Sequence, residues 1–532
     1  MDLPESNPIT EREPVLMKPN SEIKDTEMGD DAMSGDEADM ARLGLTQETR
    51  RMFGLLPLLG FTTVLLCSWE AAYPFFITAF INGGGPSMLY GYVFCFFGSL
   101  ATCASIAEMA SMYPTSGGQY HWVALMAPPK WARFLSYLTV GWVSVLGWQA
   151  ACVLGTFLGG TIIQGLLVLN DPSYAYQRWH GTLLLYAVLL LSLFINTVTV
   201  RLLPAIEGAL LWLHVLGFFA VLIPLVHLAP KSPASFVFAD WSNVSGYSDG
   251  LSFFVGLTSS SIIFVGYDGA CHMAEEVKNA SINVPRSMIF TVLLNGALGF
   301  ATFIAILFCI GDVESALGTQ TGWPFIQIFY NATNSRAGAT AMTSILTAFA
   351  VCATFSYLAA ASRQLWAFAR DKGVPFSSTI AKVDKRFKIP LWAVGCTALF
   401  NALLALINIG STAAFNAIVS LVIAGLFSSY LICISLMIRK RLRKEQIAFG
   451  PWNMGSWGMT VNIVAMVYTL ITFVMSFFPP ATPVTLITMN WSVVVFSAAI
   501  VFGLVFWVLV GRKQYHGPAI NPRFARRQDE SV

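Results

Sequence analysis

The chain has 532 residues, of which 55% are hydrophobic and 11% are charged, and its mean hydropathy is +0.64. Soluble domains carry about 25% charged residues, so this composition excludes an ordinary soluble protein and indicates an integral membrane protein. The net charge of +2 is nearly neutral, and no nucleic-acid partner is expected.

The first 50 residues are acidic and poor in aromatic side chains, and they lack the apolar core and cleavage site of a signal peptide. We expect 1–50 to be a disordered cytosolic tail. The membrane domain is expected over 51–513, followed by a cytosolic C-terminal tail at 514–532.

About 20 apolar residues are needed for a helix to cross the hydrocarbon core of a bilayer. The sequence therefore predicts an all-α integral membrane protein with about twelve spans. They are expected at 55–80, 88–110, 134–168, 182–200, 203–228, 250–274, 287–311, 338–366, 391–409, 413–438, 459–478 and 491–511.

The first predicted span contains polar residues at membrane depth. Its sequence, LLPLLGFTTVLLCSWEAAYPFF, carries Ser68, Trp69, Glu70 and Pro74 near the middle. An ionisable side chain at that depth is tolerated where it faces a cavity, a substrate or a partner. We therefore expect the helix to be broken there.

The sixth predicted span is interrupted in the same way. It reads SIIFVGYDGACHMAEEVKNASINVPRS from residue 261, with Gly266, Tyr267, Asp268, Gly269 and His272 inside the apolar run. Secondary transporters often bind substrate between two corresponding broken helices, one in each inverted repeat. The two breaks are five spans apart, as a five-plus-five inverted repeat requires, so solute transport is the leading interpretation.

Glu70 and Asp268 are expected to approach one another from the two repeats. Each carboxylate costs about 2.5–3.5 kcal/mol on insertion scales if it stays alone in hydrocarbon. A cationic substrate, a proton or a buried donor should neutralise them, and Trp69 and Tyr267 beside them could add cation–π attraction. Alternatively, the two carboxylates only accept hydrogen bonds that hold the broken helices.

Two loops are expected to form an inner gate on the cytosolic side. They are 114–118 after the second span and 362–371 after the eighth, and their Gly, Pro, Arg and Asp residues suit tight turns and charge pairs. Glu108 precedes the first loop and Arg363 lies in the second, and together with Asp268 and Glu70 they are the candidates for proton coupling or gating. Simple packing of short loops is the alternative.

Basic residues are distributed unevenly along the chain. If the N-terminus is cytosolic, the cytosolic segments hold most of them, and the outer loops hold only Arg178, Lys231 and Arg336. This asymmetry fits the positive-inside rule with both termini in the cytosol.

The sequence contains no phosphate-binding loop, zinc-protease pair or nucleophile elbow. We expect neither an enzyme nor a metal or cofactor site, and transport is expected to be driven by a gradient.

Five motifs resemble one family of transporters. They are NGGGPSMLYGY at 82–92, AEMASMYPTSGGQYHW at 107–122, FVGYDGACHMAEEVKNASINVPRSM at 264–288, SRQLWAFARDKGVPFS at 362–377 and YHGP at 515–518. Together they resemble the amino acid–polyamine–organocation superfamily, in its fungal branch of amino acid, GABA and choline permeases, over about 45–518. The resemblance implies a LeuT-like fold of ten helices in two inverted halves plus two accessory helices.

The resemblance also implies a substrate site between the broken first and sixth helices, at 67–72 and 265–270. Similar transporters place further contacts on the third, eighth and tenth helices, where Gln149, Thr354, Ser356 and Asn416 are the matching candidates. The expected substrate-binding residues are Ser68, Trp69, Glu70, Gly266, Tyr267, Asp268, Gly269, Gln149 and Asn416.

This chain departs from the family pattern at the first break. Many members have closely spaced glycines there, whose amides bind a substrate carboxylate, whereas this chain has Cys67 to Glu70. The acidic residue favours a substrate with an exposed ammonium group. The leading hypothesis is a proton symporter in the plasma membrane that imports an amino acid or a GABA-like compound. The alternatives are a choline or polyamine permease of the same fold, a non-transporting nutrient sensor on the same scaffold, and a membrane enzyme.

Overall fold

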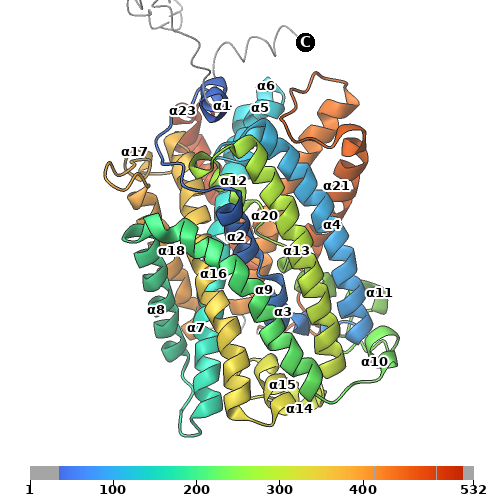
Figure 1. Ribbon diagram of the computed structural model, residues 1–532. Coiled ribbons are helices and arrows are strands. Elements are labelled where there is room, and N and C mark those ends of the chain that lie inside the picture. The colour runs from blue at the N-terminus through green and yellow to red at the C-terminus, as the bar shows by residue number, and fades with distance from the viewer. Residues whose placement is uncertain (1–34, 411–413, 487, 519–532) are drawn as a thin grey trace, which may run out of the picture.

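The protein is a bundle of long helices in the computed structural model, which describes residues 35–410, 414–486 and 488–518 (Figure 1). Within these residues, 11 helical segments are long and apolar enough to cross a membrane. They are α2–α3 (Leu55–Leu66, Ser68–Ile81), α4 (Gly84–Met112), α6–η1–α7 (Pro129–Phe134, Leu135–Trp142, Val143–Asn170), α8 (Arg178–Thr197), η2–α9 (Val200–Leu202, Leu203–Leu228), α13 (Ala280–Cys309), α16 (Arg336–Arg370), α18–α19 (Leu391–Ala405, Ile407–Gly410), α20 (Ala414–Leu442), η4–α21 (Gly455–Trp457, Gly458–Met475) and α22–η5–α23 (Ser492–Phe506, Trp507–Gly511, Arg512–Gln514).

Of the twelve predicted spans, the sixth is the one missing from these 11 segments. It is broken into α11 (Asp249–Ile262) and α12 (Gly269–His272), so neither piece alone has membrane length. Apart from two isolated β-bridges, the described residues contain no β-structure. The prediction of an all-α, multi-pass membrane protein is therefore confirmed.

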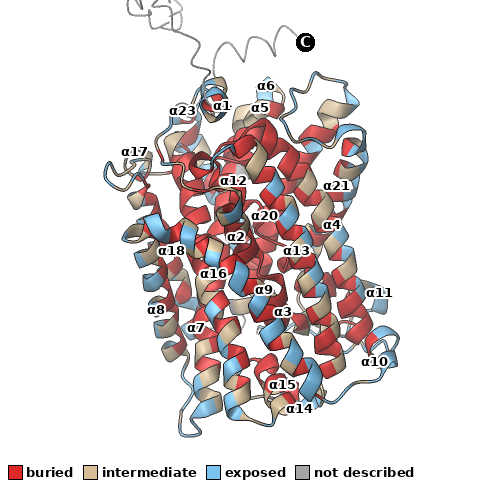
Figure 2. Cartoon of the chain, in the orientation of Figure 1, coloured by how far each residue is buried: buried red, intermediate tan, exposed pale blue. Residues whose placement is uncertain are grey.

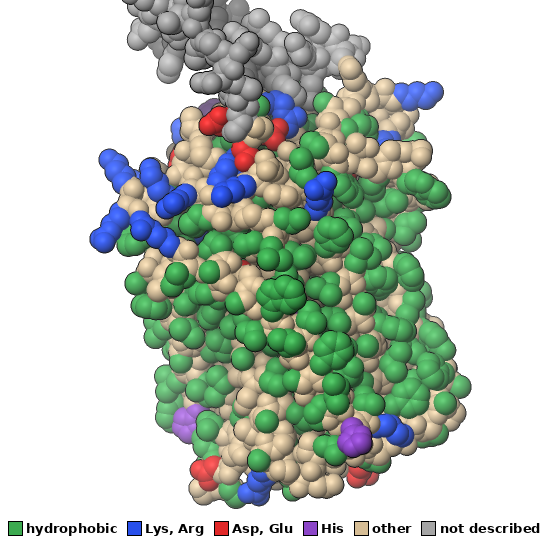
Figure 3. All heavy atoms as spheres, in the orientation of Figure 1, with side chains coloured by type: hydrophobic (Ala, Val, Ile, Leu, Met, Phe, Trp, Pro, Cys, Tyr) green, Lys and Arg blue, Asp and Glu red, His purple; other side chains and the backbone are tan. Residues whose placement is uncertain are grey.

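The two ends of the bundle differ in charge. Hydrophobic side chains cover the middle of the face shown in Figure 3, and Lys and Arg gather at the end that carries α1 (Gly35–Leu43) and α17 (Ser377–Ile380). We call this the basic end. Exposed basic residues near α17 are Lys372, Lys382, Lys385, Arg386 and Lys388. The opposite end carries the short helices α10 (Ala234–Phe238), α14 (Val313–Leu317) and α15 (Pro324–Thr333).

Buried residues fill the centre of the bundle, while α8 exposes much of its surface to the surroundings (Figure 2). In the centre, α7 packs against α16 and α20, and α2 packs against α9. Small residues allow close helix contacts. A Cβ on Gly425 of α20 would lie 2.7 Å from Cα of Gly147 on α7, and a Cβ on Gly60 of α2 would lie 2.0 Å from the carbonyl oxygen of Glu207 on α9.

The first helix breaks at Cys67. This residue has φ 44° and ψ 42°, in the left-handed region, so it ends α2, and α3 begins at the next residue. The freed backbone groups find side-chain partners. The hydroxyl of Tyr357 donates to the carbonyl of Leu65 (2.7 Å), and the N–H of Ser68 donates to Oδ1 of Asn295 (2.9 Å).

The sixth helix breaks over residues 263–268, which form turns between α11 and α12. Gly266 has φ +119°, a conformation that favours glycine. The hydroxyl of Ser68 donates to the carbonyl of Ile263 (2.8 Å), so a side chain from the first break holds the second. The two predicted breaks are confirmed.

The segment from residue 35 onward is folded against the bundle, whereas residues 1–34 and 519–532 lie outside the described residues. Asp36 in α1 accepts hydrogen bonds from the backbone N–H groups of Asn279 and Ala280 at the start of α13 (2.8 and 3.1 Å), and Phe53 forms a β-bridge with Val277. At the other terminus, Tyr515 is buried. The division into a membrane domain at 51–513 with cytosolic tails at 1–50 and 514–532 stays a prediction.

Candidate functional site

A cavity of about 50 Å³ lies between the two helix breaks. The first helix contributes Leu66, Cys67 and Glu70 to its wall, and the sixth contributes Val265 and Gly266. Ligand pockets usually measure about 300–1,000 Å³, so the cavity is nearly closed in this structure. The rest of the wall is mostly apolar and includes Trp148, Ala151, Leu154, Gly155, Phe325, Ala350, Ala353, Tyr357, Val422 and Leu426.

Glu70 is the only residue of the Asp, Glu, Lys, Arg or His type among the described residues that line this cavity. It is buried, and its Oε1 lies 2.8 Å from Nδ1 of His214 on α9. Its Oε2 has no hydrogen-bond partner among the described residues. The cavity is therefore lined by a carboxylate that has one oxygen without a hydrogen-bond partner.

His214 is a residue that the sequence analysis missed. It is fully buried in a largely apolar span, and besides orienting Glu70 it accepts a hydrogen bond at its carbonyl from Nε1 of Trp69 (3.2 Å). The ring of Trp69 packs against Phe218 and Phe349, with centroids 6.0 and 6.1 Å away. Trp69 thus lies behind the cavity wall, and its role in substrate binding stays a prediction.

Asp268 is fully buried and surrounded by donors. Nε2 of Gln119 on α5 (Gln119–Met126) and Nε1 of Trp148 donate to its Oδ2 (2.6 and 3.2 Å), and the hydroxyl of Tyr430 on α20 donates to its Oδ1 (2.6 Å). Nε2 of His272 lies 3.7 Å from Oδ2. Its hydrogen bonds link the sixth break to α5, α7 and α20, and Asp268 is not among the residues that line the cavity.

Glu70 and Asp268 were expected to share one site, and in this structure they have separate partners. Glu70 bonds to His214 on α9, whereas Asp268 bonds to α5, α7 and α20. The reason is geometric. Residues 263–268 have no helical periodicity, so the break directs Asp268 away from the first helix.

The other expected binding residues occupy different places. Tyr267 stacks on Tyr430 at 5.7 Å, Gly269 packs against Leu65 and Trp148, and Nε2 of Gln149 donates to the hydroxyl of Thr397 (3.1 Å). Ser68 holds the two breaks, as described above. Of the nine, Glu70 and Gly266 line the cavity between the breaks, and Asn416 lines a second cavity.

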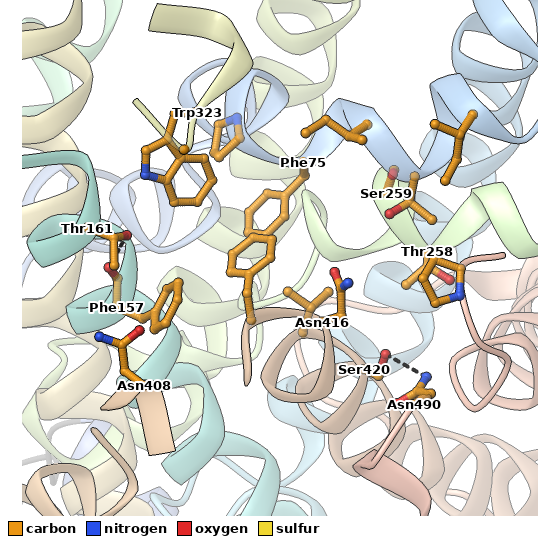
Figure 4. A pocket seen from close by; sticks show the side chains of 18 of the residues that line it. Phe75, Phe157, Thr161, Thr258, Ser259, Trp323, Asn408, Asn416, Ser420 and Asn490 are labelled. Carbon is orange, nitrogen blue, oxygen red and sulfur yellow. Dashed lines mark hydrogen bonds between the residues drawn. The ribbon is translucent and has the colours of Figure 1, made fainter. Parts of the chain in front are cut away.

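The second cavity, of about 430 Å³, lies toward the opposite end of the bundle (Figure 4). It is lined in part by polar groups, among them Asn416, Ser420 and Asn490, where Nδ2 of Asn490 donates to Oγ of Ser420 (3.0 Å). Pro74 and Phe75 line both cavities. We call the larger one the outer cavity.

An aromatic cluster separates the two cavities. Phe75 stacks on Phe415 at 5.4 Å with an interplanar angle of 11°, and Phe157 and Trp323 each lie 5.5 Å from the same Phe415 ring. These four rings come from the first, third and tenth spans and from the loop before α15.

Ion pairs close the basic end. Nε of Arg363 on α16 lies 2.9 Å from Oε1 of Glu276, which follows α12 in the short helix η3 (Ala274–Glu276). Arg370, the last residue of α16, makes two hydrogen bonds to Glu275 (2.9 and 3.0 Å). The expected gating residue Arg363 thus links the eighth helix to the segment after the sixth.

The expected gating residue Glu108 forms a separate pair at the same end. Its Oε2 accepts from Arg441 on α20 (2.5 Å), and its Oε1 accepts from the backbone N–H of Met454 (3.0 Å). Both carboxylate oxygens are therefore occupied by donors from the last third of the chain. Its participation in gating stays a prediction.

Two titratable groups near these ion pairs have shifted pKa values. Burial raises the pKa of Asp371 to about 6, although Arg370 and a hydrogen bond from Tyr120 (2.8 Å) lower it. Burial lowers the pKa of His121 in α5 to about 3, with a further contribution from Arg370. His121 is therefore neutral at physiological pH.

A model of the family described as amino acid permease matches residues 58–499. The chain is 34% identical over 438 residues to a Macrophomina phaseolina protein named as an amino acid/polyamine transporter, covering 82% of this chain and 96% of that protein. It is 29% identical to a Saccharomyces cerevisiae choline transporter (88% and 83% covered) and 29% identical to an Arabidopsis thaliana amino-acid permease (92% and 97% covered). These relatives are permeases rather than enzymes. The chain, a multi-pass membrane protein with two broken helices, therefore belongs to the amino acid permease family.

Proposed function

We propose that the protein imports a small amine-bearing compound, an amino acid or a GABA-like molecule, in symport with protons. The observation that carries the proposal is the cavity between the two helix breaks, whose one charged residue, Glu70, has a carboxylate oxygen without a partner. An unpaired buried acceptor costs about 1–3 kcal/mol. An ammonium group entering the cavity would supply the missing donor and the opposite charge.

Choline is the second candidate. A relative of similar length is named as a choline transporter, and the cavity wall includes Trp148, Phe75 and Phe325, whose rings can attract a quaternary ammonium group by cation–π interaction. A quaternary ammonium has no N–H to donate to Glu70. The free oxygen of Glu70 therefore favours a primary amine over choline.

The arrangement of the two cavities supports alternating access. An aromatic cluster lies between the substrate cavity and the outer cavity, whereas ion pairs, including Arg363 with Glu276, close the basic end. We propose that the basic end faces the cytosol of a cell whose plasma membrane holds the protein, since this satisfies the positive-inside rule. The structure then corresponds to a state closed to the cytosol, in which the substrate enters from outside.

Uptake in cells that lack their own permeases tests the function. Labelled GABA should be taken up, and unlabelled primary amines should compete with it better than choline does. Uptake should fall when a protonophore is added and rise as external pH is lowered from 7 to 5. Cells that carry Gly395→Ala, a change at an exposed position with open space around it, provide the control for expression. Uptake that depends on external sodium and does not change when the protonophore is added would contradict proton symport.

A further inference from the structure

Besides Glu70, another buried carboxylate lies close to the cavity, and the proposed function gives it no role. It is Glu207 in α9. Glu207 is fully buried, about 10 Å along the helix from its start at Val200, given a rise of about 1.5 Å per residue. The hydroxyl of Ser356 on α16 donates to its Oε1 (2.7 Å), and its Oε2 has no partner among the described residues. One neutral hydroxyl is thus its only hydrogen-bond donor in this part of the chain.

Glu207 differs in this respect from the other carboxylates. Six Asp or Glu side chains are buried in the described residues, and the other five have a basic partner or several donors. Glu108, Glu275 and Glu276 pair with arginines, Glu70 pairs with His214, and Asp268 accepts from three donors. A buried ionised group without a partner is unfavourable by several kcal/mol. Among the six, Glu207 has the strongest physical reason to take up a proton.

Its surroundings contain no compensating cation. The titratable groups within electrostatic range are the thiols of Cys67 at the first break and Cys352 on α16. Of the helices that pack on α9, η2 carries Arg201, α13 carries Arg286 and α16 carries Arg336, and these three are exposed. α16 also carries Arg363 and Arg370, which pair with Glu276 and Glu275. His214, seven residues further along α9, is bonded to Glu70. No described basic side chain forms an ion pair with Glu207.

Glu207 nevertheless lies next to the first half of the broken first helix. Its backbone is in close contact with Gly60 of α2, and α2 is the half of the first helix on the basic side of the break. Its partner Ser356 lies between Ala353 and Tyr357, which line the cavity. The carboxylate is therefore just behind the cavity wall, at a junction of α2, α9 and α16, and closer to the basic end than Glu70 is.

From this placement we propose that Glu207 is the residue that binds the transported proton, an inference that rests on the proposed proton symport. The proton forms an O–H bond at the free Oε2, which converts the carboxylate to the neutral acid, and the bond breaks when the proton leaves toward the basic end. Only the neutral acid is compatible with tight packing of the three helices around it. Closure around substrate thus requires the proton, and opening toward the basic end admits water that releases it.

The test separates proton coupling from substrate movement. Purified Glu207→Gln protein in liposomes should exchange internal for external labelled GABA, or labelled choline if that is what the wild type carries, within about threefold of the wild-type rate. The same variant should lose at least tenfold in accumulation driven by a pH gradient, and its uptake should no longer depend on external pH. Gly208→Ala changes the adjacent residue, where a Cβ would meet nothing within 4 Å, and should behave as wild type in both assays.

Two results would overturn the assignment. One is gradient-driven, pH-dependent accumulation by Glu207→Gln, and the other is equal loss of exchange and accumulation in correctly inserted protein. If Glu207→Gln does not reach the membrane, Glu207→Asp decides the question, because a shifted carboxyl should move the pH midpoint of uptake and an unchanged midpoint would refute the proposal. Wild-type uptake that does not depend on the pH gradient would instead refute proton symport itself.

Discussion

Replacing Asp268 by asparagine tests how the sixth break is used in transport. An asparagine can keep the geometry of the site, because its oxygen can accept from Gln119 and Trp148 in the place of Oδ2. Its amide group can donate to the hydroxyl of Tyr430 if that hydroxyl reverses. We therefore expect Asp268→Asn to fold and to reach the membrane at near-normal levels.

The lost charge sets the size of the effect. Hydrogen bonds to charged groups contribute about 1.5–3 kcal/mol and neutral ones about 0.5–1.5 kcal/mol, so the three bonds together lose about 3 kcal/mol. These bonds tie the sixth break to α5, α7 and α20 in the state that is closed at the basic end. A change of about 3 kcal/mol shifts a two-state equilibrium on the order of 100-fold. One conformation should then dominate, and most uptake should be lost.

Initial rates of labelled uptake, divided by the amount of protein at the cell surface, measure this effect. Tyr430→Phe removes one donor from Asp268 and keeps the charge, so it should reduce uptake less. The double variant should fall short of the sum of the two single effects, because both act on the same bond. Uptake by Asp268→Asn at the wild-type rate, with wild-type surface levels, would refute the reasoning.

Three further predictions concern the cavity, the turn and the basic end. Glu70→Gln should weaken the apparent affinity for amine-bearing substrates about tenfold or more, if about 1.4 kcal/mol of ammonium binding is lost, and the amount of protein at the cell surface should stay the same. Unchanged affinity together with a lower amount of protein would show that Glu70 has a structural role instead. Gly266→Ala should destabilise the protein by about 1–3 kcal/mol, because φ +119° is unfavourable for alanine, whereas Gly395→Ala should not; equal thermal unfolding midpoints in detergent would contradict this. The contribution of His121 to the free energy of unfolding should fall by about 2 kcal/mol from pH 7 to pH 5, because the unfolded chain protonates His121 near pH 6.5 and the folded chain only near pH 3. His121→Gln should lack that part of the loss, and an identical pH profile would show that His121 does not contribute.

The sequence predicts the spans and both breaks because hydrophobic length and polar interruption are local properties. It predicts the direction of side chains poorly at a break, since the 3.6-residue period that orients them stops there. Glu70 follows the first break within a regular helix and does face the cavity, whereas Asp268 lies in the irregular turn and does not line it. Glu207 and His214 were missed for another reason. Their span is otherwise rich enough in apolar residues to be predicted as a membrane helix, which conceals two ionisable residues seven positions apart on one face of the helix.

The aromatic cluster between the two cavities has a consequence for inhibitor chemistry. A molecule with an amine at one end and a bulky tail at the other can place the amine beside Glu70 only by parting Phe75 from Phe415, and its tail then occupies the 430 Å³ outer cavity. With the rings held apart, the first and tenth spans cannot complete closure. Such a compound would bind in competition with substrate and yet not be carried, so lengthening the tail of a transported amine should convert it stepwise into a blocker.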